Sequence, residues 1–175
     1  MLSTMDMDVD ELQHALGGIV LEAAYLERVL RASFAALTGS KYTAAIDGRM
    51  MAHALIEDCH HIAKVHTDIA EPARAALLEA LDACDTANRK RNRVIHDAWA
   101  YRADNVMITL QSQRVSQDVT AVAMTFGELT ELTAQITAAT AALAAAVTSA
   151  LGADSMRIED RLRLELGNAV NAEIG

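Results

Sequence analysis

The sequence has little proline, cysteine or aromatic residue, and these absences narrow the fold class. Its 175 residues include one Pro, two Cys and only 3 % aromatic side chains. Cys59 and Cys84 show no paired spacing, so the chain has neither a disulfide framework nor a cysteine zinc site. Hydrophobic residues make up 52 % of the chain. Many of them are Ala, which has the highest helix propensity and little bulk, so we expect closely packed helices rather than a large sheet.

We expect neither a signal peptide nor a membrane span. Its N-terminus begins with acidic residues rather than the basic residues and apolar run of a signal peptide. Residues 132–153 carry no charge, but their bulky side chains fall on one helical stripe and most others are Ala or Thr. This pattern is typical of an amphipathic core helix. We therefore expect a cytoplasmic protein outside the membrane, with a length that suits a single domain.

Apolar periodicity predicts five helices, and β-branched runs between them predict one hairpin. Gly39 and Gly152 mark helix ends, and Pro72 suits the first turn of a helix. Thr125 and Glu128 have capping-box spacing, which marks a helix start. The predicted fold is all-α, a four- to five-helix up-and-down bundle with a small β-hairpin inserted before the fourth helix. The expected helices cover residues 8–37, 42–66, 70–98, 126–151 and 155–173, and the hairpin covers 104–124.

One cationic segment interrupts a chain whose formal net charge is −9. Residues 89–99, Arg-Lys-Arg-Asn-Arg-Val-Ile-His-Asp-Ala-Trp, contain four Lys and Arg residues and the only Trp. The apolar stripe of the predicted third helix passes through Asn88 and Arg91. Arg91 must therefore be paired, hydrated in a cleft or facing a partner chain, because an unpaired buried charge is very costly. Asn92 and His96 lie four residues apart and so share a helix face.

Arg91, Asn92 and His96 suit phosphodiester cleavage. Arg presents a permanently charged planar fork to a phosphate, and His moves protons near neutral pH. In RNA the 2′-hydroxyl is an internal nucleophile, so we expect no metal or other cofactor, and products with a 2′,3′-cyclic phosphate and a 5′-hydroxyl. We expect Arg91 to bind phosphate, Asn92 to orient, and His96 to act as general acid or base. Further cations are expected to hold neighbouring phosphates of the RNA: Arg89, Lys90, Arg93 and Arg102.

Arg91-Asn92-x-x-x-His96, near the end of a helix in a small bundle, resembles the Arg-x(4–6)-His signature of the HEPN domain family. The resemblance implies a bundle of four or five helices that forms a homodimer, with two such motifs meeting in one cleft. It also implies a metal-independent endoribonuclease, a toxin or antiviral effector that is paired in some members with a nucleotidyltransferase-like antitoxin. The residues that carry the resemblance are Arg91, Asn92 and His96 alone.

Two alternatives stay open from the sequence. Some HEPN domains bind or scaffold without cutting, and Arg91 would then pair with a carboxylate across the bundle while His96 caps its helix. The high net negative charge and the scarcity of stacking aromatics argue against a broad affinity for RNA. The second alternative is a metal-binding bundle, because Glu57-x-x-His60 has the spacing used in di-metal helical bundles. Glu22 would supply a third ligand if the first two helices form an antiparallel hairpin.

Overall fold

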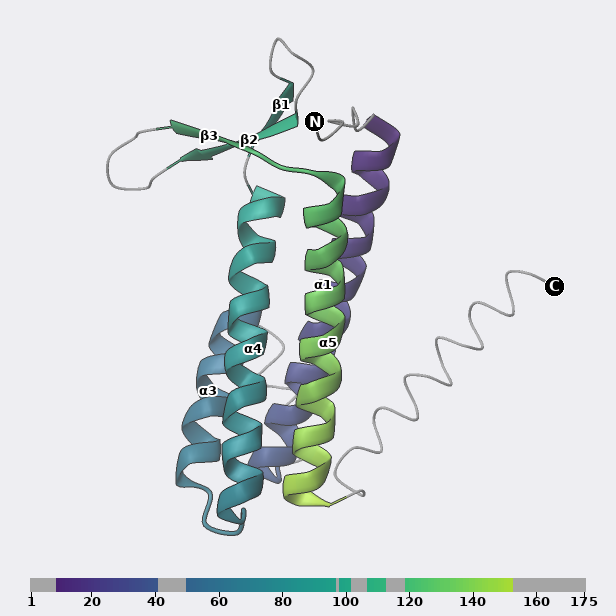
Figure 1. Ribbon diagram of the computed structural model, residues 1–175. Coiled ribbons are helices and arrows are strands. Elements are labelled where there is room, and N and C mark those ends of the chain that lie inside the picture. Colours follow the sequence, from purple (N-terminus) through teal and green to yellow (C-terminus); the bar gives the residue numbers. More distant parts are fainter. Residues whose placement is uncertain (1–8, 41–49, 97, 102–106, 113–118, 153–175) are drawn as a thin grey trace, which may run out of the picture. The chain divides into compact units, whose positions relative to one another are not determined.

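The computed structural model describes residues 9–40, 50–96, 98–101, 107–112 and 119–152 of the chain. Within them the protein is an all-α helical bundle with a small antiparallel sheet (Figure 1). The elements follow the order α1 (Val9–Thr38), α3 (Ala52–Val65), α4 (Glu71–His96), β1 (Ala98–Tyr101), β2 (Met107–Ser112), β3 (Val119–Ala123) and α5 (Phe126–Leu151). The fold class predicted from composition and periodicity is confirmed.

The helix ends follow the local signals in the sequence. Gly39 has a φ of 63° and donates its N–H to the Ala35 carbonyl, which closes α1. Gly152 closes α5 in the same way, with a φ of 89°. At the start of α5, the Thr125 N–H donates to Glu128 Oε2 and the Glu128 N–H donates to Thr125 Oγ1. This reciprocal pair is the predicted capping box.

The predicted helix over 42–66 is wrong at its described N-terminal end. Met51 is extended, with φ −77° and ψ 158°, and α3 begins only at Ala52. The Met50 carbonyl accepts a hydrogen bond of 2.9 Å from Arg31 Nη2 on α1, so a tertiary contact holds this residue outside a helix. Residues 42–49 of that prediction, and the whole predicted helix over 155–173, lie outside the described residues.

The small sheet is larger than the predicted hairpin. Antiparallel β2 and β3 confirm the hairpin, and β1 adds a third strand that pairs with β2, in the order β1-β2-β3. The prediction that the third helix extends to residue 98 is therefore wrong at Ala98, which pairs with Leu110. Trp99 and Tyr101 favour strands, but a run of four residues that also contains two Ala is too short for its pattern to separate a strand from the end of a helix.

The described part of the chain divides by its contacts into two compact units, each built from segments of several helices. The first comprises the described residues within Met1–Ala24 and Thr86–Ala138, and the same restriction applies to the second unit. Thr137 Oγ1 on α5 donates to Glu22 Oε2 on α1 at 2.9 Å in this unit. Its buried side chains come from α1, α4 and α5: Ala15, Ile19, Ala23, Ala87, Asn88, Val94, Leu129, Leu132 and Ile136.

The second unit comprises Tyr25–Asp85 and Ala139–Gly175. Arg74 holds the connection between α3 and α4, since its Nη2 donates to the carbonyls of His66 at 2.9 Å and Ile69 at 2.8 Å. The core of this unit is mainly aliphatic, with Phe34 and two thiols, and its hydrophobic members with exposures of 0–2 % are the following: Leu26, Val29, Leu30, Leu55, Cys59, Ala63, Ile69, Leu77, Leu81, Cys84, Leu143 and Val147.

Among the described helices, α5 is long and apolar enough to cross a membrane by length and composition. Four of the five residues of the stripe predicted for a core helix, Leu132, Ile136, Leu143 and Val147, are 5 % exposed or less, whereas the fifth, Leu151, is half-buried. Much of the rest of its surface is Ala and Thr. Burial of this stripe agrees with a core helix, and the cytoplasmic location stays a prediction.

Gly17 and Gly39 allow a paired test of backbone freedom. A Cβ at Gly17 meets no atom within 4 Å. Gly17→Ala should therefore raise the free energy of unfolding by about 0.5–1 kcal/mol, because Ala loses less backbone entropy in a helix. Gly39→Ala should lower it by about 1 kcal/mol, because the left-handed conformation is strained for Ala. Urea denaturation followed by circular dichroism measures both, and a change of the same sign in the two variants would contradict this explanation.

Burial raises the pKa of the Cys59 and Cys84 thiols from 9.0 to about 12. Because the thiolate is the reactive form, a thiol reagent should modify neither cysteine in the native protein and both in denaturant. Both thiols ionise more easily in the unfolded chain, so their contribution to stability should be complete below about pH 9 and should decline as the pH rises toward 12. Rapid modification of the native protein at neutral pH would contradict this burial.

Candidate functional site

The C-terminal end of α4 is fixed by the only Trp of the chain. Trp99 Nε1–H donates to the Val94 carbonyl at 2.9 Å. This carbonyl is one of the last four of α4, which have no partner further along the helix. Trp99 also pairs with Thr109 in the β1–β2 ladder. The sheet is thereby tied to the turn of α4 that carries His96.

The inner stripe of α4 becomes polar as the sequence predicts. Leu77, Leu81 and Cys84 have exposures of 0 %, and Asn88 is still buried with 6 %. The next member, Arg91, is half-buried, and its Nη1 donates to Asn92 Oδ1 at 2.8 Å. Its Nε is buried without a hydrogen-bond partner among the described residues. No carboxylate in this part of the chain pairs with Arg91, so the cross-bundle ion pair of the non-catalytic alternative is not found there.

Arg89 and Arg93, rather than Arg91, lie beside His96 on the exposed surface of α4. An α-helix turns by about 100° per residue, so Arg93 lies about 60° and Arg89 about 20° from His96 around the axis. Arg91 lies about 140° away. Arg89, Arg93 and His96 are all exposed. We call these three residues the basic stripe.

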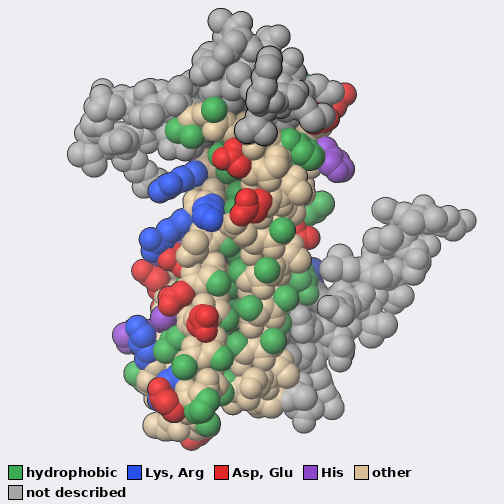
Figure 2. All heavy atoms as spheres, in the orientation of Figure 1, with side chains coloured by type: hydrophobic (Ala, Val, Ile, Leu, Met, Phe, Trp, Pro, Cys, Tyr) green, Lys and Arg blue, Asp and Glu red, His purple; other side chains and the backbone are tan. Residues whose placement is uncertain are grey.

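A pocket of about 270 Å³ lies next to the basic stripe, between the last turns of α4 and the first turns of α5. Figure 2 shows basic side chains over α4 and carboxylates over α5 in this region. Arg93 belongs to both the pocket and the basic stripe. The lining residues combine two cations, two carboxylates, an amide and an apolar floor: Lys90, Arg93, Val94, Met124, Glu128, Glu131, Leu132 and Gln135.

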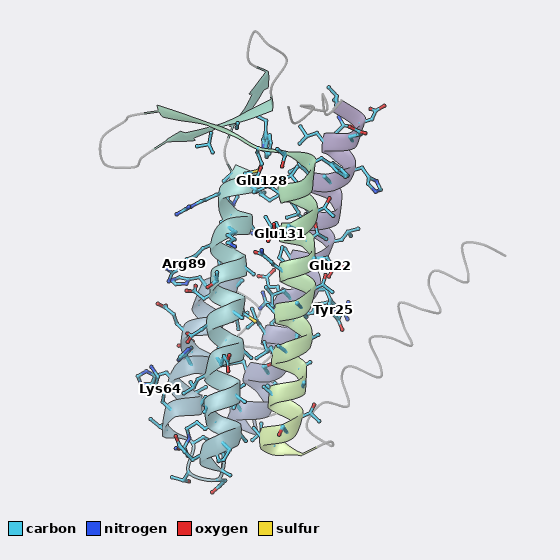
Figure 3. All side chains as sticks on the ribbon, viewed as in Figure 1. Glu22, Tyr25, Lys64, Arg89, Glu128 and Glu131 are labelled. Atoms are coloured by element: carbon cyan, nitrogen blue, oxygen red, sulfur yellow. The ribbon has the colours of Figure 1, made fainter. Side chains whose placement is uncertain are left out.

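The polar residues of the pocket are joined by hydrogen bonds. Lys90 Nζ donates to Gln135 Oε1 at 2.8 Å, and Gln135 Nε2 donates to Glu131 Oε1 at 2.8 Å. Glu128 uses its Oε2 in the capping box of α5. In Figure 3, Glu128 and Glu131 lie on the side of α5 that faces α4, whereas Arg89 points away from α5. The two carboxylates balance the two cations, so the pocket has no formal net charge.

Sequence reasoning missed the contributions of Glu131 and Gln135. Glu128, Glu131 and Gln135 are spaced three and four apart, which places them on one helix face. That spacing was the available signal, but it does not indicate which helix this face meets. Of the cations predicted to bind RNA, Lys90 and Arg93 share the pocket, Arg89 lies on the basic stripe, and Arg102 lies outside the described residues.

The residues of the metal alternative each have a polar partner within their own unit. Glu22 accepts a hydrogen bond from Thr137, Glu57 lies 3.4 Å from His53, and His60 lies 2.9 Å from Asp82. Among the described residues, no cluster of three or more His, Cys, Asp or Glu side chains is arranged to hold a metal ion. His53 and His60 of α3 instead interact with carboxylates on α3 and α4, since His53 also lies 3.7 Å from Asp85.

The chain matches no model of a known protein family, no curated protein and no solved structure. The resemblance to the HEPN family therefore stays a prediction from three residues.

The Trp99 hydrogen bond should contribute measurably to stability. Trp99→Phe keeps an aromatic ring but removes the donor to Val94, which should lower the free energy of unfolding by about 1 kcal/mol. Tyr25→Phe is the matched control, because the Tyr25 hydroxyl has no partner among the described residues. Its change should stay within about 0.5 kcal/mol. Equal unfolding midpoints for wild type and Trp99→Phe in urea would show that the bond does not stabilise the end of α4.

Proposed function

We propose that this protein is a metal-independent endoribonuclease of HEPN type. The observation that carries the proposal is the exposed His96 at the end of α4, with Arg93 and Arg89 beside it on the same surface. This arrangement offers a proton-transfer group and fixed positive charge at one position, which is what cleavage of an RNA phosphodiester requires. The 2′-oxygen attacks phosphorus and the bond to the 5′-oxygen breaks.

In this mechanism His96 takes the proton of the 2′-hydroxyl. The 5′-oxygen leaves with a proton from a second imidazole, and we assign that imidazole to His96 of a second copy in a homodimer. The products are a 2′,3′-cyclic phosphate and a 5′-hydroxyl, and no cofactor takes part. Arg93 and Arg89 stabilise the charge that develops on the phosphate oxygens.

In this proposal Arg91 mainly positions Asn92, whereas the sequence suggests that Arg91 binds the phosphate directly. The hydrogen bond between Arg91 Nη1 and Asn92 Oδ1 fixes the amide of Asn92, whose face of α4 is also that of His96. Because this bond occupies Oδ1, the amide can present its N–H groups to the substrate. Arg91 then acts mainly by positioning Asn92, with its charge as a more distant attraction for the phosphate.

A biological role as a toxin or antiviral effector, with a nucleotidyltransferase-like antitoxin as partner, follows only from the HEPN resemblance. The net charge of −9 supports a narrow RNA preference over broad affinity, because most of the surface repels phosphate. Contact with RNA would be confined to the end of α4.

Cleavage of single-stranded and structured RNA in EDTA tests the proposal. His96→Ala should lower the rate by about 100-fold or more, because general acid–base catalysis contributes 10²–10⁴. His61→Ala is the matched control, since His61 is also an exposed helical histidine, on α3, and should cut at the wild-type rate. No cleavage by wild type, or equal cleavage by His96→Ala, would refute the proposal.

The half-buried position of Arg91 favours one second candidate, a non-catalytic dimer or regulatory domain. In that case Arg91→Ala would impair dimerisation, measured by analytical ultracentrifugation, and wild type would cut no RNA. Under the nuclease proposal, Arg91→Ala instead lowers the cleavage rate of a protein that is active before substitution.

A further inference from the structure

The pocket beside the basic stripe is suited to a neutral, flat group with hydrogen-bond donors. Its two cations and two carboxylates cancel, so it offers no net attraction to a bare phosphate. Val94 and Leu132 are buried with 4 % and 5 % exposure, and together with Met124 they form an apolar surface. The volume of about 270 Å³ lies just below the roughly 300 Å³ at which pockets for drug-sized ligands begin. A single nucleobase with part of its sugar is of that size class.

The Glu131 carboxylate is the acceptor in the pocket that is best oriented to bind such a group. Gln135 Nε2 donates to Glu131 Oε1, and Lys90 Nζ donates to Gln135 Oε1. The carboxylate is therefore oriented by two successive hydrogen bonds of 2.8 Å. No partner among the described residues contacts its other oxygen. A carboxylate accepts but does not donate, and it therefore selects a ligand edge that carries N–H groups. Guanine offers two adjacent ones, N1–H and the 2-amino group.

Arg93 connects this pocket to the proposed catalytic residue. It lines the pocket and also lies next to His96 around α4. Its guanidinium has no hydrogen bond or ion pair with another described residue, whereas Lys90 is engaged with Gln135. Arg93 is thus the cation that remains for the phosphate of a nucleotide whose base occupies the pocket.

We propose that the pocket binds the guanine base of a nucleotide, with Glu131 accepting from its N1–H and 2-amino groups and Arg93 binding its phosphate. If the pocket is a subsite for RNA, the assignment rests on the proposed function, since the pocket would place a guanosine beside His96. If the pocket binds a free guanine nucleotide, the assignment does not depend on nuclease activity. The shared chemistry is a guanine base attached to a phosphate.

Calorimetric titration of the full chain with 5′-GMP and 5′-IMP tests the proposal directly. The two nucleotides differ only in the 2-amino group, and neither contains a bond that the proposed nuclease would cut. We expect 5′-GMP to bind about tenfold more tightly, the value of one hydrogen bond to a charged acceptor. Glu131→Gln should reduce 5′-GMP affinity to the level of 5′-IMP. Glu79→Gln, which changes an exposed carboxylate of α4 outside the pocket, should leave both affinities unchanged.

Arg93→Met tests the phosphate contact, because it keeps a long aliphatic stem and removes the charge. It should weaken 5′-GMP binding by about tenfold and leave guanosine binding unchanged. No 5′-GMP binding by wild type at millimolar concentration, equal binding of the two nucleotides, or an unchanged ratio in Glu131→Gln would overturn the proposal.

The source of the guanine is decided by mapping RNA cleavage in parallel. Cuts at a fixed position relative to G, lost in Glu131→Gln, would identify an RNA subsite. Binding of 5′-GMP by a protein that cuts no RNA would refute the nuclease but support a site for a free guanine nucleotide. Cleavage of RNA without any 5′-GMP binding would refute the pocket assignment and leave the nuclease intact.

Discussion

The rotation of α4 by about 100° per residue is the constraint on which the candidate site depends. It assigns neighbouring residues of one short cationic segment to different environments. Arg91 continues the inner stripe and bonds to Asn92, Arg89 and Arg93 share the exposed surface with His96, and Lys90 faces α5. Because the hydrogen bonds of the helix fix this rotation, the residues cannot be exchanged between these surfaces without ending the helix. This cationic segment therefore divides into the hydrogen-bonded pair Arg91–Asn92, the basic stripe and one wall of the pocket.

Much of the fold follows from local signals in the sequence. The capping box at Thr125 and Glu128 places the start of α5, and Gly39 and Gly152 place two helix ends where the left-handed conformation is needed. These helix ends can be predicted from the sequence because each depends on atoms within a few residues of one another. The start of α3 is not readable in this way, since the Met50 carbonyl is held by Arg31, which lies 19 residues away in the sequence. β1 is likewise fixed by pairing with β2 and not by its own composition.

In the candidate site, too, relations within one helix can be predicted from the sequence, and contacts between helices cannot. His96, Asn92 and Arg91 are found from spacing on one helix, because their relation is set by helix geometry alone. The pocket depends on which face of α5 meets α4, and this is decided by burial of Leu129, Leu132 and Ile136 on the neighbouring face. Glu131 and Gln135 then follow as the polar residues that remain beside that apolar stripe. A sequence pattern shows that these residues lie together, but not which part of α4 they contact.

The hydrogen bond that ties the sheet to α4 has one further consequence. Trp99 is the only tryptophan of the chain, and its indole lies half-buried at the turn that carries His96. Indole emission is sensitive to the polarity and hydrogen bonding of its surroundings. Because Trp99 is the only Trp, fluorescence excited at wavelengths where Tyr does not absorb comes from a single chromophore at the edge of the candidate site. A local change at the end of α4 would therefore be visible as a spectral shift in the unlabelled protein, separate from global unfolding.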